Sequence, residues 1–110
     1  MADVPVPGPL RIEAYREGDV TRLALDGELD LASAPELERE LREAEESGAT
    51  RIVIDLGGLG FMDSTGLQAL LRARKRASAA AYELVLRRGP HQVQRVFELT
   101  KTVDAFSFED

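Results

Sequence analysis

The sequence predicts one α/β domain in which a mixed β-sheet is covered by helices. Short apolar runs typical of strands alternate with longer segments of helical periodicity, in the order β-β-α-β-α-β-α-β. A tight turn joins the first two strands and a helix precedes each later one, which predicts one antiparallel pair followed by parallel crossovers. At 110 residues the chain has the length of one domain. We assign residues 10–110 to it, and the proline-rich residues 1–9 to a flexible N-terminal arm.

Two strands open the domain. Residues 10–17 alternate apolar and polar side chains, which predicts a half-buried strand with Ala14 on its apolar side. Residues 17–19 predict a turn, and residues 20–27 predict a second strand that forms a hairpin with the first. Residues 28–32 are expected to leave the sheet as a loop.

A helix is expected to follow this loop. Ser33 is placed to cap it, Pro35 suits its first turn, and Glu36 completes a capping box with the serine. Gly48 is a typical helix end. The residues between them repeat apolar side chains at helical spacing on an otherwise charged helix: Leu37, Leu41 and Ala44.

The most apolar run of the chain, residues 51–56, predicts a central strand. The glycine-rich residues 57–63 are expected to connect it to a second helix with Leu67, Leu70 and Leu71 at helical spacing. Four cations are expected near the end of that helix, where they would complement its dipole: Arg72, Arg74, Lys75 and Arg76.

The last third of the chain predicts three more elements. Residues 82–87 alternate like a strand, and Pro90 opens a third helix. Residues 103–108 predict a last short strand. The buried side of the third helix is expected to consist of Val93, Val96 and Phe97.

The composition excludes several kinds of site. The chain has no cysteine and one histidine, which excludes disulfides, thiolate or histidine-rich metal sites and a cysteine nucleophile. The net charge of −6 disfavours nucleic acid and anionic lipid as partners. No apolar stretch approaches the roughly 18 residues of a membrane span, and no signal peptide is evident. We expect a cytoplasmic protein with no cofactor, no metal and no membrane or nucleic-acid partner.

Residues 61–67, Phe-Met-Asp-Ser-Thr-Gly-Leu, form the segment with the most chemical content. They join a buried strand to an amphipathic helix, the kind of point at which open α/β sheets place their sites. Asp63, Ser64 and Thr65 can each cap that helix, and its N-terminus would tolerate a phosphate on Ser64 or Thr65. The alternative that Asp63 or Ser64 is only a helix cap stays open.

Three other readings are less well supported. A hydrolase would need Ser64 as nucleophile and His91 as base, but no G-x-S-x-G elbow or oxyanion site can be placed, so we expect no enzyme. The cationic run in the second helix could bind nucleic acid, but the negative net charge of the chain disfavours such a partner. Residues 57–60 lack the G-K-[ST] ending of a phosphate-binding loop.

Two segments together resemble the STAS domain, as found in stand-alone bacterial anti-sigma-factor antagonists. Residues 52–67, IVIDLGGLGFMDSTGL, resemble the family signature, in which D-S-[ST]-G-L opens the second helix. Residues 27–44, GELDLASAPELERELREA, resemble the end of the family's second strand and the helix after it. The resemblance covers about residues 10–105 and implies the STAS fold.

The resemblance also implies a mechanism. The residue after the signature aspartate, here Ser64, would be phosphorylated by an anti-sigma factor that has a histidine-kinase-like ATPase fold and acts as a serine kinase. Unphosphorylated antagonist would bind this kinase and free the sigma factor, and the phosphorylated form would not bind. A metal-dependent serine phosphatase of the PP2C type would reset the cycle.

Seven residues are assigned to partner contact on this basis. Asp30 would contact the partner or orient the serine, although it can equally be a loop acid that caps the next helix. Met62 and Leu67 would be exposed apolar contacts, with core packing as the alternative. Gly66 would allow close approach of a partner or is a tolerated glycine in a first turn. The full set is Asp30, Met62, Asp63, Ser64, Thr65, Gly66 and Leu67.

A second reading stays within the family. STAS domains also act as constitutive adaptors or scaffold subunits of stress-signalling assemblies and lipid-transport ATPases, in which the serine would matter less. Family members usually carry a further helix after the last strand, and this sequence departs from that pattern. The departure would leave Phe106 and Phe108 exposed or available for self-association, so a monomer or a weak dimer is expected.

Overall fold

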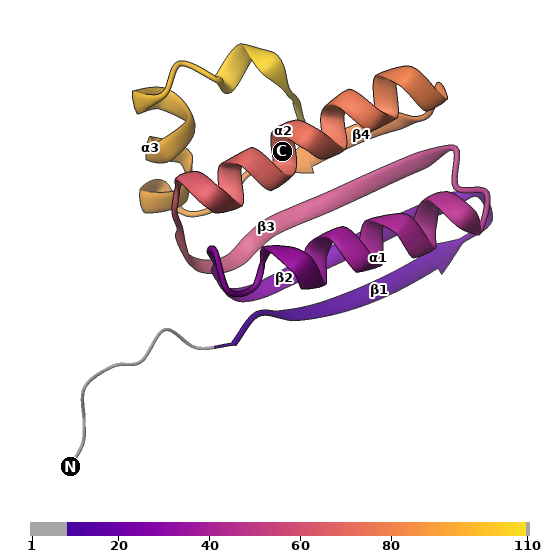
Figure 1. The fold of residues 1–110 in the computed structure, drawn as a ribbon, viewed down its shortest axis with the longest axis horizontal. Helices are drawn as coiled ribbons and strands as arrows, with labels where there is room; N and C mark the ends of the chain where they lie inside the picture. The colour runs from indigo at the N-terminus through magenta and orange to yellow at the C-terminus, as the bar shows by residue number, and fades with distance from the viewer. Residues whose placement is uncertain (1–8, 110) are drawn as a thin grey trace.

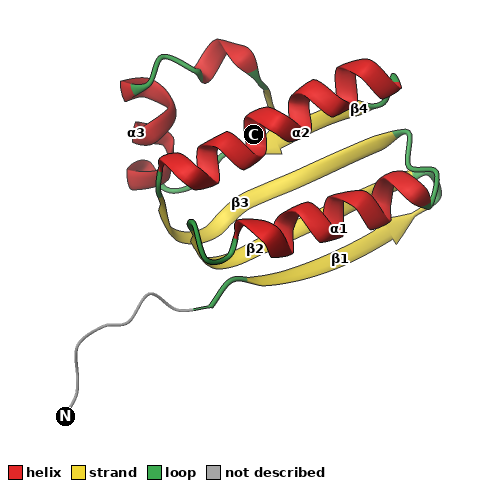
Figure 2. Ribbon diagram, viewed as in Figure 1, coloured by secondary structure: helices red, strands yellow, loops and turns green. Residues whose placement is uncertain are grey.

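Five strands form one mixed sheet in the spatial order β1-β2-β3-β4-β5. The structure is a computed structural model and describes residues 9–109. β1 runs antiparallel to β2, and every later neighbouring pair is parallel, as the sequence predicts. The strands, yellow in Figure 2, are β1 (Arg11–Glu17), β2 (Val20–Leu29), β3 (Arg51–Met62), β4 (Glu83–Arg87) and β5 (Ser107–Glu109).

Three helices connect the parallel strands and complete the predicted order of elements. They are α1 (Ala34–Glu46), α2 (Ser64–Ala80) and α3 (His91–Leu99). Figure 1 shows α1 and α2 running side by side over one face of the sheet, with α3 beyond one end of α2. Within residues 9–109 none of the helices is both long and apolar enough to cross a membrane.

All three helices bury their apolar stripes in a single core. Leu37 and Leu41 of α1, Leu70 of α2 and Phe97 of α3 are fully buried, which confirms the predicted helical periodicities. The inward-facing residues of the central strands complete this core: Leu23, Leu25, Ile52, Ile54, Leu56 and Leu86.

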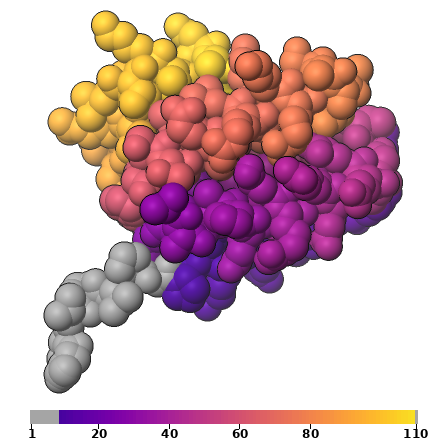
Figure 3. Space-filling view, in the orientation of Figure 1, coloured from indigo at the N-terminus to yellow at the C-terminus, as the bar shows by residue number. Residues whose placement is uncertain are grey.

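The cationic run of α2 lies in the middle of the helix, so the prediction that it lies near the helix end was wrong. The last turn of α2 carries no basic residue. Arg72 Nε lies 3.4 Å from Glu38 of α1, and Arg76 Nε lies 3.3 Å from Glu45 of α1. These cations tie α2 to α1, and Figure 3 shows the side chains of the two helices (magenta and coral) meeting across this face.

Tyr82 extends the same contact. Its hydroxyl donates a hydrogen bond to Glu45. The pKa of the Tyr82 hydroxyl is raised above its ordinary value, mainly because the group is partly buried and secondly because of this hydrogen bond.

The opposite face of the sheet carries ion pairs around the buried and paired Val53 and Val85. Arg22 of β2 pairs with Asp55 of β3 at 3.8 Å, and Arg51 of β3 pairs with Glu83 of β4 at 3.1 Å. Glu109 of β5 lies 3.8 Å from Arg22 and 3.2 Å from Arg51. Because the side chains of Arg22 and Arg51 are each more than a third exposed, these pairs add little to stability.

Two strands are longer than predicted. β2 runs to Leu29, and β3 continues to Met62 through the glycines that were expected to form a connection. The register between the two strands shifts between Ala24 and Asp26 and again between Gly27 and Glu28, so the pair is bulged. A Cβ at Gly58 would lie 2.6 Å from the Leu25 carbonyl oxygen, so a glycine lets β3 stay paired there.

Two further predictions at the start of the domain were wrong. Ala14 is exposed because β1 is the edge strand of the sheet and only Ile12 within it is half-buried. Ser33 precedes α1 as expected, but its side chain makes no capping hydrogen bond, so the capping box with Glu36 does not form. The Ser33 hydroxyl instead donates to the Glu28 carbonyl oxygen at 2.8 Å, which ties the start of α1 back to the end of β2.

The C-terminal segment is only partly a strand. Residues 103–105 form a 3₁₀ turn, and only Ser107–Glu109 pair with β4. Phe106 and Phe108 are half-buried rather than exposed, because both rings pack edge-on against Phe97, at centroid distances of 5.5 and 5.3 Å. The predicted flexible arm, residues 1–9, lies outside the described residues apart from Pro9 and stays a prediction.

Candidate functional site

β2 and β3 end together at one edge of the sheet. Leu29 is the register partner of Met62, and the Asp63 N–H donates to the Leu29 carbonyl oxygen at 3.2 Å. Asp30 and Asp63 are therefore the first residues beyond two adjacent parallel strands. This is the carboxyl edge at which open α/β sheets place their sites.

Asp63 is the N-cap of α2. Its Oδ1 accepts a hydrogen bond from the Gly66 N–H at 2.9 Å, and its carbonyl oxygen accepts the first intrahelical bond from Leu67 N–H at 3.0 Å. The expectation that Asp63 caps the helix is confirmed. Neither Ser64 nor Thr65 is needed for that task.

Replacing Asp63 separates its capping role from its charge. Asp63→Ala is expected to lower the free energy of unfolding by about 1 kcal/mol, because the Gly66 N–H loses its acceptor. Asp63→Asn keeps an oxygen that can accept this hydrogen bond, so it should lower the free energy of unfolding clearly less than Asp63→Ala does. Urea unfolding of the two variants measures the difference, and equal losses would show that the hydrogen bond is not the source of the effect.

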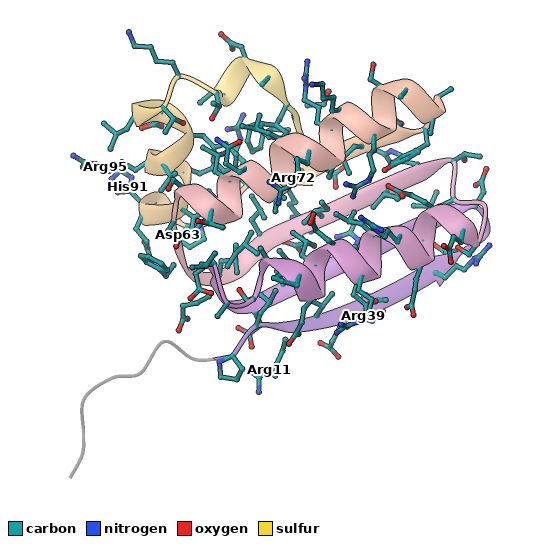
Figure 4. All side chains as sticks on the ribbon, viewed as in Figure 1. Arg11, Arg39, Asp63, Arg72, His91 and Arg95 are labelled. Carbon is teal, nitrogen blue, oxygen red and sulfur yellow. The ribbon has the colours of Figure 1, made fainter. Side chains whose placement is uncertain are left out.

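Ser64 is the first residue of α2 and is exposed. Within residues 9–109 no hydrogen bond involves its hydroxyl, so no protein group competes for that oxygen or activates it as a nucleophile. Figure 4 shows Asp63 at the same end of the molecule as His91 and Arg95 of α3. Among the described residues, no hydrogen bond joins His91 to the serine.

Three of the residues predicted to contact a partner lie inside the protein. Met62 and Leu67 are 3% and 2% exposed and belong to the core, so their expected exposure was wrong. Gly66 is also buried, and a Cβ there would lie 2.5 Å from the Leu29 carbonyl oxygen. The glycine serves the close approach of α2 to β2 and not the approach of a partner. Thr65 is half-buried beside Ser64.

Asp30 shapes the loop between β2 and α1. Its Oδ1 accepts hydrogen bonds from the N–H groups of Ala32 at 3.0 Å and Ser33 at 3.1 Å. The Asp30 carbonyl oxygen also accepts from the Ala34 N–H at 2.8 Å, at the first turn of α1. Asp30 therefore holds the entry of the helix, as the alternative reading of this acid anticipated, while its side chain remains half-exposed at the edge beside Asp63.

The sequence reasoning missed two exposed apolar residues at this edge. Leu31, next to Asp30, is 73% exposed, and Phe61, next to Met62, is 46% exposed. Phe61 carried only a partial signal. A period of two continued from Leu56 to Met62 turns Phe61 outward, but it would also turn Leu59 outward, and Leu59 is buried because the strand pair is bulged. Leu31 carried only the weaker signal of an apolar side chain in a polar loop.

The N-terminus of α3 borders the same edge. The Gln92 side-chain nitrogen donates to the Gly60 carbonyl oxygen at 3.4 Å, which places the start of α3 beside the end of β3. In the part of the chain that the structure describes, no group of three or more acidic, histidine or cysteine side chains could hold a metal ion. The arrangement is a surface with an exposed hydroxyl, two carboxylates and two apolar side chains.

The chain resembles proteins of one family over nearly its whole length. The STAS domain profile matches residues 11–110. The chain is 35% identical to BtrV of Bordetella bronchiseptica over 82 residues, which cover 74% of this chain and 71% of BtrV. It is 30% identical to the anti-sigma-B factor antagonist of Staphylococcus aureus over 95 residues, 86% of this chain and 88% of that protein.

Solved structures agree on the fold. An anti-sigma factor antagonist from Mycobacterium paratuberculosis superposes with a TM-score of 0.84 at 21% identity, covering 96% of this chain and 89% of its own. The antagonist SpoIIAA in its unphosphorylated form gives a TM-score of 0.74 at 24% identity, covering 92% and 88%. With its five-stranded mixed sheet and three helices, the chain is a STAS-domain protein of the anti-sigma factor antagonist family.

Proposed function

We propose that this chain is a phosphorylation-switched anti-sigma factor antagonist. In its unphosphorylated form it binds an anti-sigma factor that is also a serine kinase with a histidine-kinase-like ATPase fold, and so frees a sigma factor. Phosphorylation of Ser64 abolishes that binding. The observation that carries the proposal is the exposed Ser64 hydroxyl, which has no hydrogen-bond partner within residues 9–109. Ser64 directly follows Asp63, whose carboxylate caps the helix.

The fold can accept a phosphate at this position. Ser64 opens α2, where free N–H groups and the helix dipole favour an anion and offset part of the repulsion from Asp63. The fold of SpoIIAA has been solved both without and with its phosphate, and this chain superposes on the two forms with TM-scores of 0.74 and 0.68. Both likenesses support a switch that leaves the fold in place.

A partner surface fitted to the neutral serine has no such compensation. The phosphate adds about 1.5 to 2 negative charges and three oxygen atoms at one point of an edge that already carries Asp30 and Asp63. A penalty of about 2–4 kcal/mol, or roughly 30- to 1,000-fold in affinity, is enough for an effective switch.

The chain is proposed to act by binding and not by catalysis. The kinase partner supplies ATP and the catalytic groups for transfer, and a PP2C-type serine phosphatase restores the free hydroxyl. Asp30 and Asp63 contribute charge to the surface that the kinase contacts, and Thr65 lies beside the acceptor serine.

Affinity capture with two baits tests the proposal. Wild-type chain and Ser64→Glu are immobilised and exposed to a lysate of the source organism, and the retained proteins are identified by mass spectrometry. We expect the wild type to retain a histidine-kinase-like ATPase and the variant to retain much less of it, because glutamate places a charge at the contact. The purified ATPase should then phosphorylate the wild-type chain on Ser64.

The opposite outcome has a definite meaning. If both baits retain the same transporter or multi-subunit assembly in equal amounts, Ser64 is not a switch. The chain would then be a constitutive STAS adaptor, and the proposal would be abandoned.

A further inference from the structure

The exposed apolar side chains of this protein are unevenly placed. Among residues 9–109, the large hydrophobic residues that are strongly exposed are Tyr15, Leu31, Phe61 and Leu99. Single exposed apolar residues are ordinary on a protein surface and need no explanation. Two of these four, however, lie at the edge that carries Ser64, where the chain would be expected to present polar groups to water.

The register of the sheet fixes the place of both residues. Phe61 pairs across the ladder with Glu28 and comes three residues before Ser64. Leu31 comes two residues after Leu29, whose register partner Met62 comes two residues before Ser64. Leu31 and Phe61 therefore belong to the two adjacent strand ends from which Asp30 and Asp63 also emerge.

The loop that displays Leu31 is held by an internal network. Asp30 Oδ1 accepts from the N–H groups of Ala32 and Ser33, and the Ser33 hydroxyl bonds to the Glu28 carbonyl oxygen. The Ser33 hydroxyl also accepts from the Asp30 N–H at 2.9 Å. A loop fixed in this way loses little conformational freedom on binding. The free energy gained when the exposed leucine contacts a partner is therefore not cancelled by an entropy cost of ordering the loop.

We infer that Leu31 and Phe61 are the apolar anchors of the surface that the anti-sigma kinase contacts. The inference deepens the proposed function and rests on it. It assigns a definite chemistry to the partner: an apolar hollow that receives the two side chains, with basic residues around it that face Asp30 and Asp63. Charge complementarity favours this occupant over a second copy of the chain, because two copies packed edge to edge would bring their Asp30 and Asp63 carboxylates together.

The same arrangement accounts for how Ser64 controls the complex. An interface with a desolvated apolar centre leaves little water to screen a new charge beside it. A phosphate on Ser64, close in sequence to Phe61, would have to be desolvated or would hold the surfaces apart. The apolar anchors supply the binding affinity, and the phosphorylation state of Ser64 determines whether the complex can form.

Three matched substitutions test the inference. Leu31→Ser and Phe61→Ser remove the two anchors, and Leu99→Ser removes a leucine of similar exposure (70%) on α3. The anti-sigma kinase retained by the wild-type chain is purified and titrated with each variant by isothermal calorimetry. We expect Leu31→Ser and Phe61→Ser to weaken binding about 10- to 30-fold, as for truncated interface anchors, and Leu99→Ser to change it less than about twofold.

A second measurement tests the charge of the partner. Asp30→Asn keeps the Oδ1 that holds the loop but removes the charge, so the affinity of this variant should depend less on salt than that of the wild type between about 0.1 and 0.5 M NaCl. Leu31→Ser should keep the wild-type salt dependence, because it removes only apolar contact.

The outcomes separate the inference from the proposed function. If the kinase binds the wild type, releases it on phosphorylation, and binds Leu31→Ser and Phe61→Ser with unchanged affinity, the anchors are wrongly assigned while the switch stands. If the kinase does not bind the wild type, the proposed function fails first. If sedimentation velocity shows a wild-type dimer that Leu31→Ser dissociates, the occupant is a second copy and the inference is overturned.

Discussion

Ser64→Ala is expected to bind the anti-sigma kinase as tightly as the wild-type chain and to remain bound when ATP is added. The substitution removes only an exposed hydroxyl that has no hydrogen-bond partner within residues 9–109. Alanine is also a good helix former at the first position of α2, so stability should change by less than about 0.5 kcal/mol. With no acceptor oxygen, the step that adds charge to the contact cannot occur.

The measurement is the fraction of complex that survives ATP. Both chains are bound to the kinase, ATP and magnesium are added, and the complex is followed by size-exclusion chromatography. The wild-type complex should dissociate as phosphate is incorporated, with an affinity loss of roughly 30- to 1,000-fold, while the Ser64→Ala complex persists. Thr65→Ala is the matched control and should be released like the wild type. Equal release of Ser64→Ala and wild type would place the switch elsewhere.

The elements with a regular apolar period could be predicted from the sequence. The stripes of α1 and α3, the buried run at the start of β3 and the mixed order of strands all follow from local patterns that a packed sheet also requires. The ends of β2 and β3 could not be predicted in this way. Glycines usually punctuate strands, but here Gly58 avoids a collision with the Leu25 carbonyl oxygen of the neighbouring strand, a contact that only the tertiary structure creates.

The candidate site shows the same division. The position of Asp63 at the start of α2 follows from the motif, whereas its place beside Asp30 at one sheet edge follows from the resemblance to the STAS fold. The inward or outward direction of the neighbouring side chains depends on where β3 ends. Ending it early at residue 56 left Met62 free to be assigned to the surface, whereas the strand that continues to Met62 buries this side chain and exposes Phe61.

The C-terminal segment contributes to the core through its aromatic residues. Phe97 is fully buried and is contacted edge-on by Phe106 and Phe108, whose rings also lie 6.3 Å apart from each other. Edge-on aromatic pairs of this kind add about 0.5–1.5 kcal/mol each beyond the area that they bury. The short strand β5 therefore matters more for covering Phe97 than for its few ladder hydrogen bonds.

Removal of residues 103–110 is consequently expected to destabilise the domain strongly. The deletion uncovers Phe97 and takes away the half-buried Phe106 and Phe108, so we expect a loss of about 3 kcal/mol and a fall in Tm on the order of 10–20 °C. Differential scanning calorimetry of the truncated and full chains measures it. Glu109→Gln is the control, because it removes the surface pairing with Arg22 and Arg51 and leaves the rings in place.

The two variants show whether β5 stabilises the domain by covering Phe97 with aromatic rings or by forming ion pairs on the surface. Glu109→Gln should cost less than about 1 kcal/mol, since exposed ion pairs contribute little. If it lowers the Tm as far as the deletion does, the ion pairs and not the rings anchor the segment. If the deletion leaves the melting curve unchanged, β5 is not part of the cooperative fold, and Phe97 must be covered by other side chains. A large loss confined to the deletion would show that the aromatic cluster completes the core over α3.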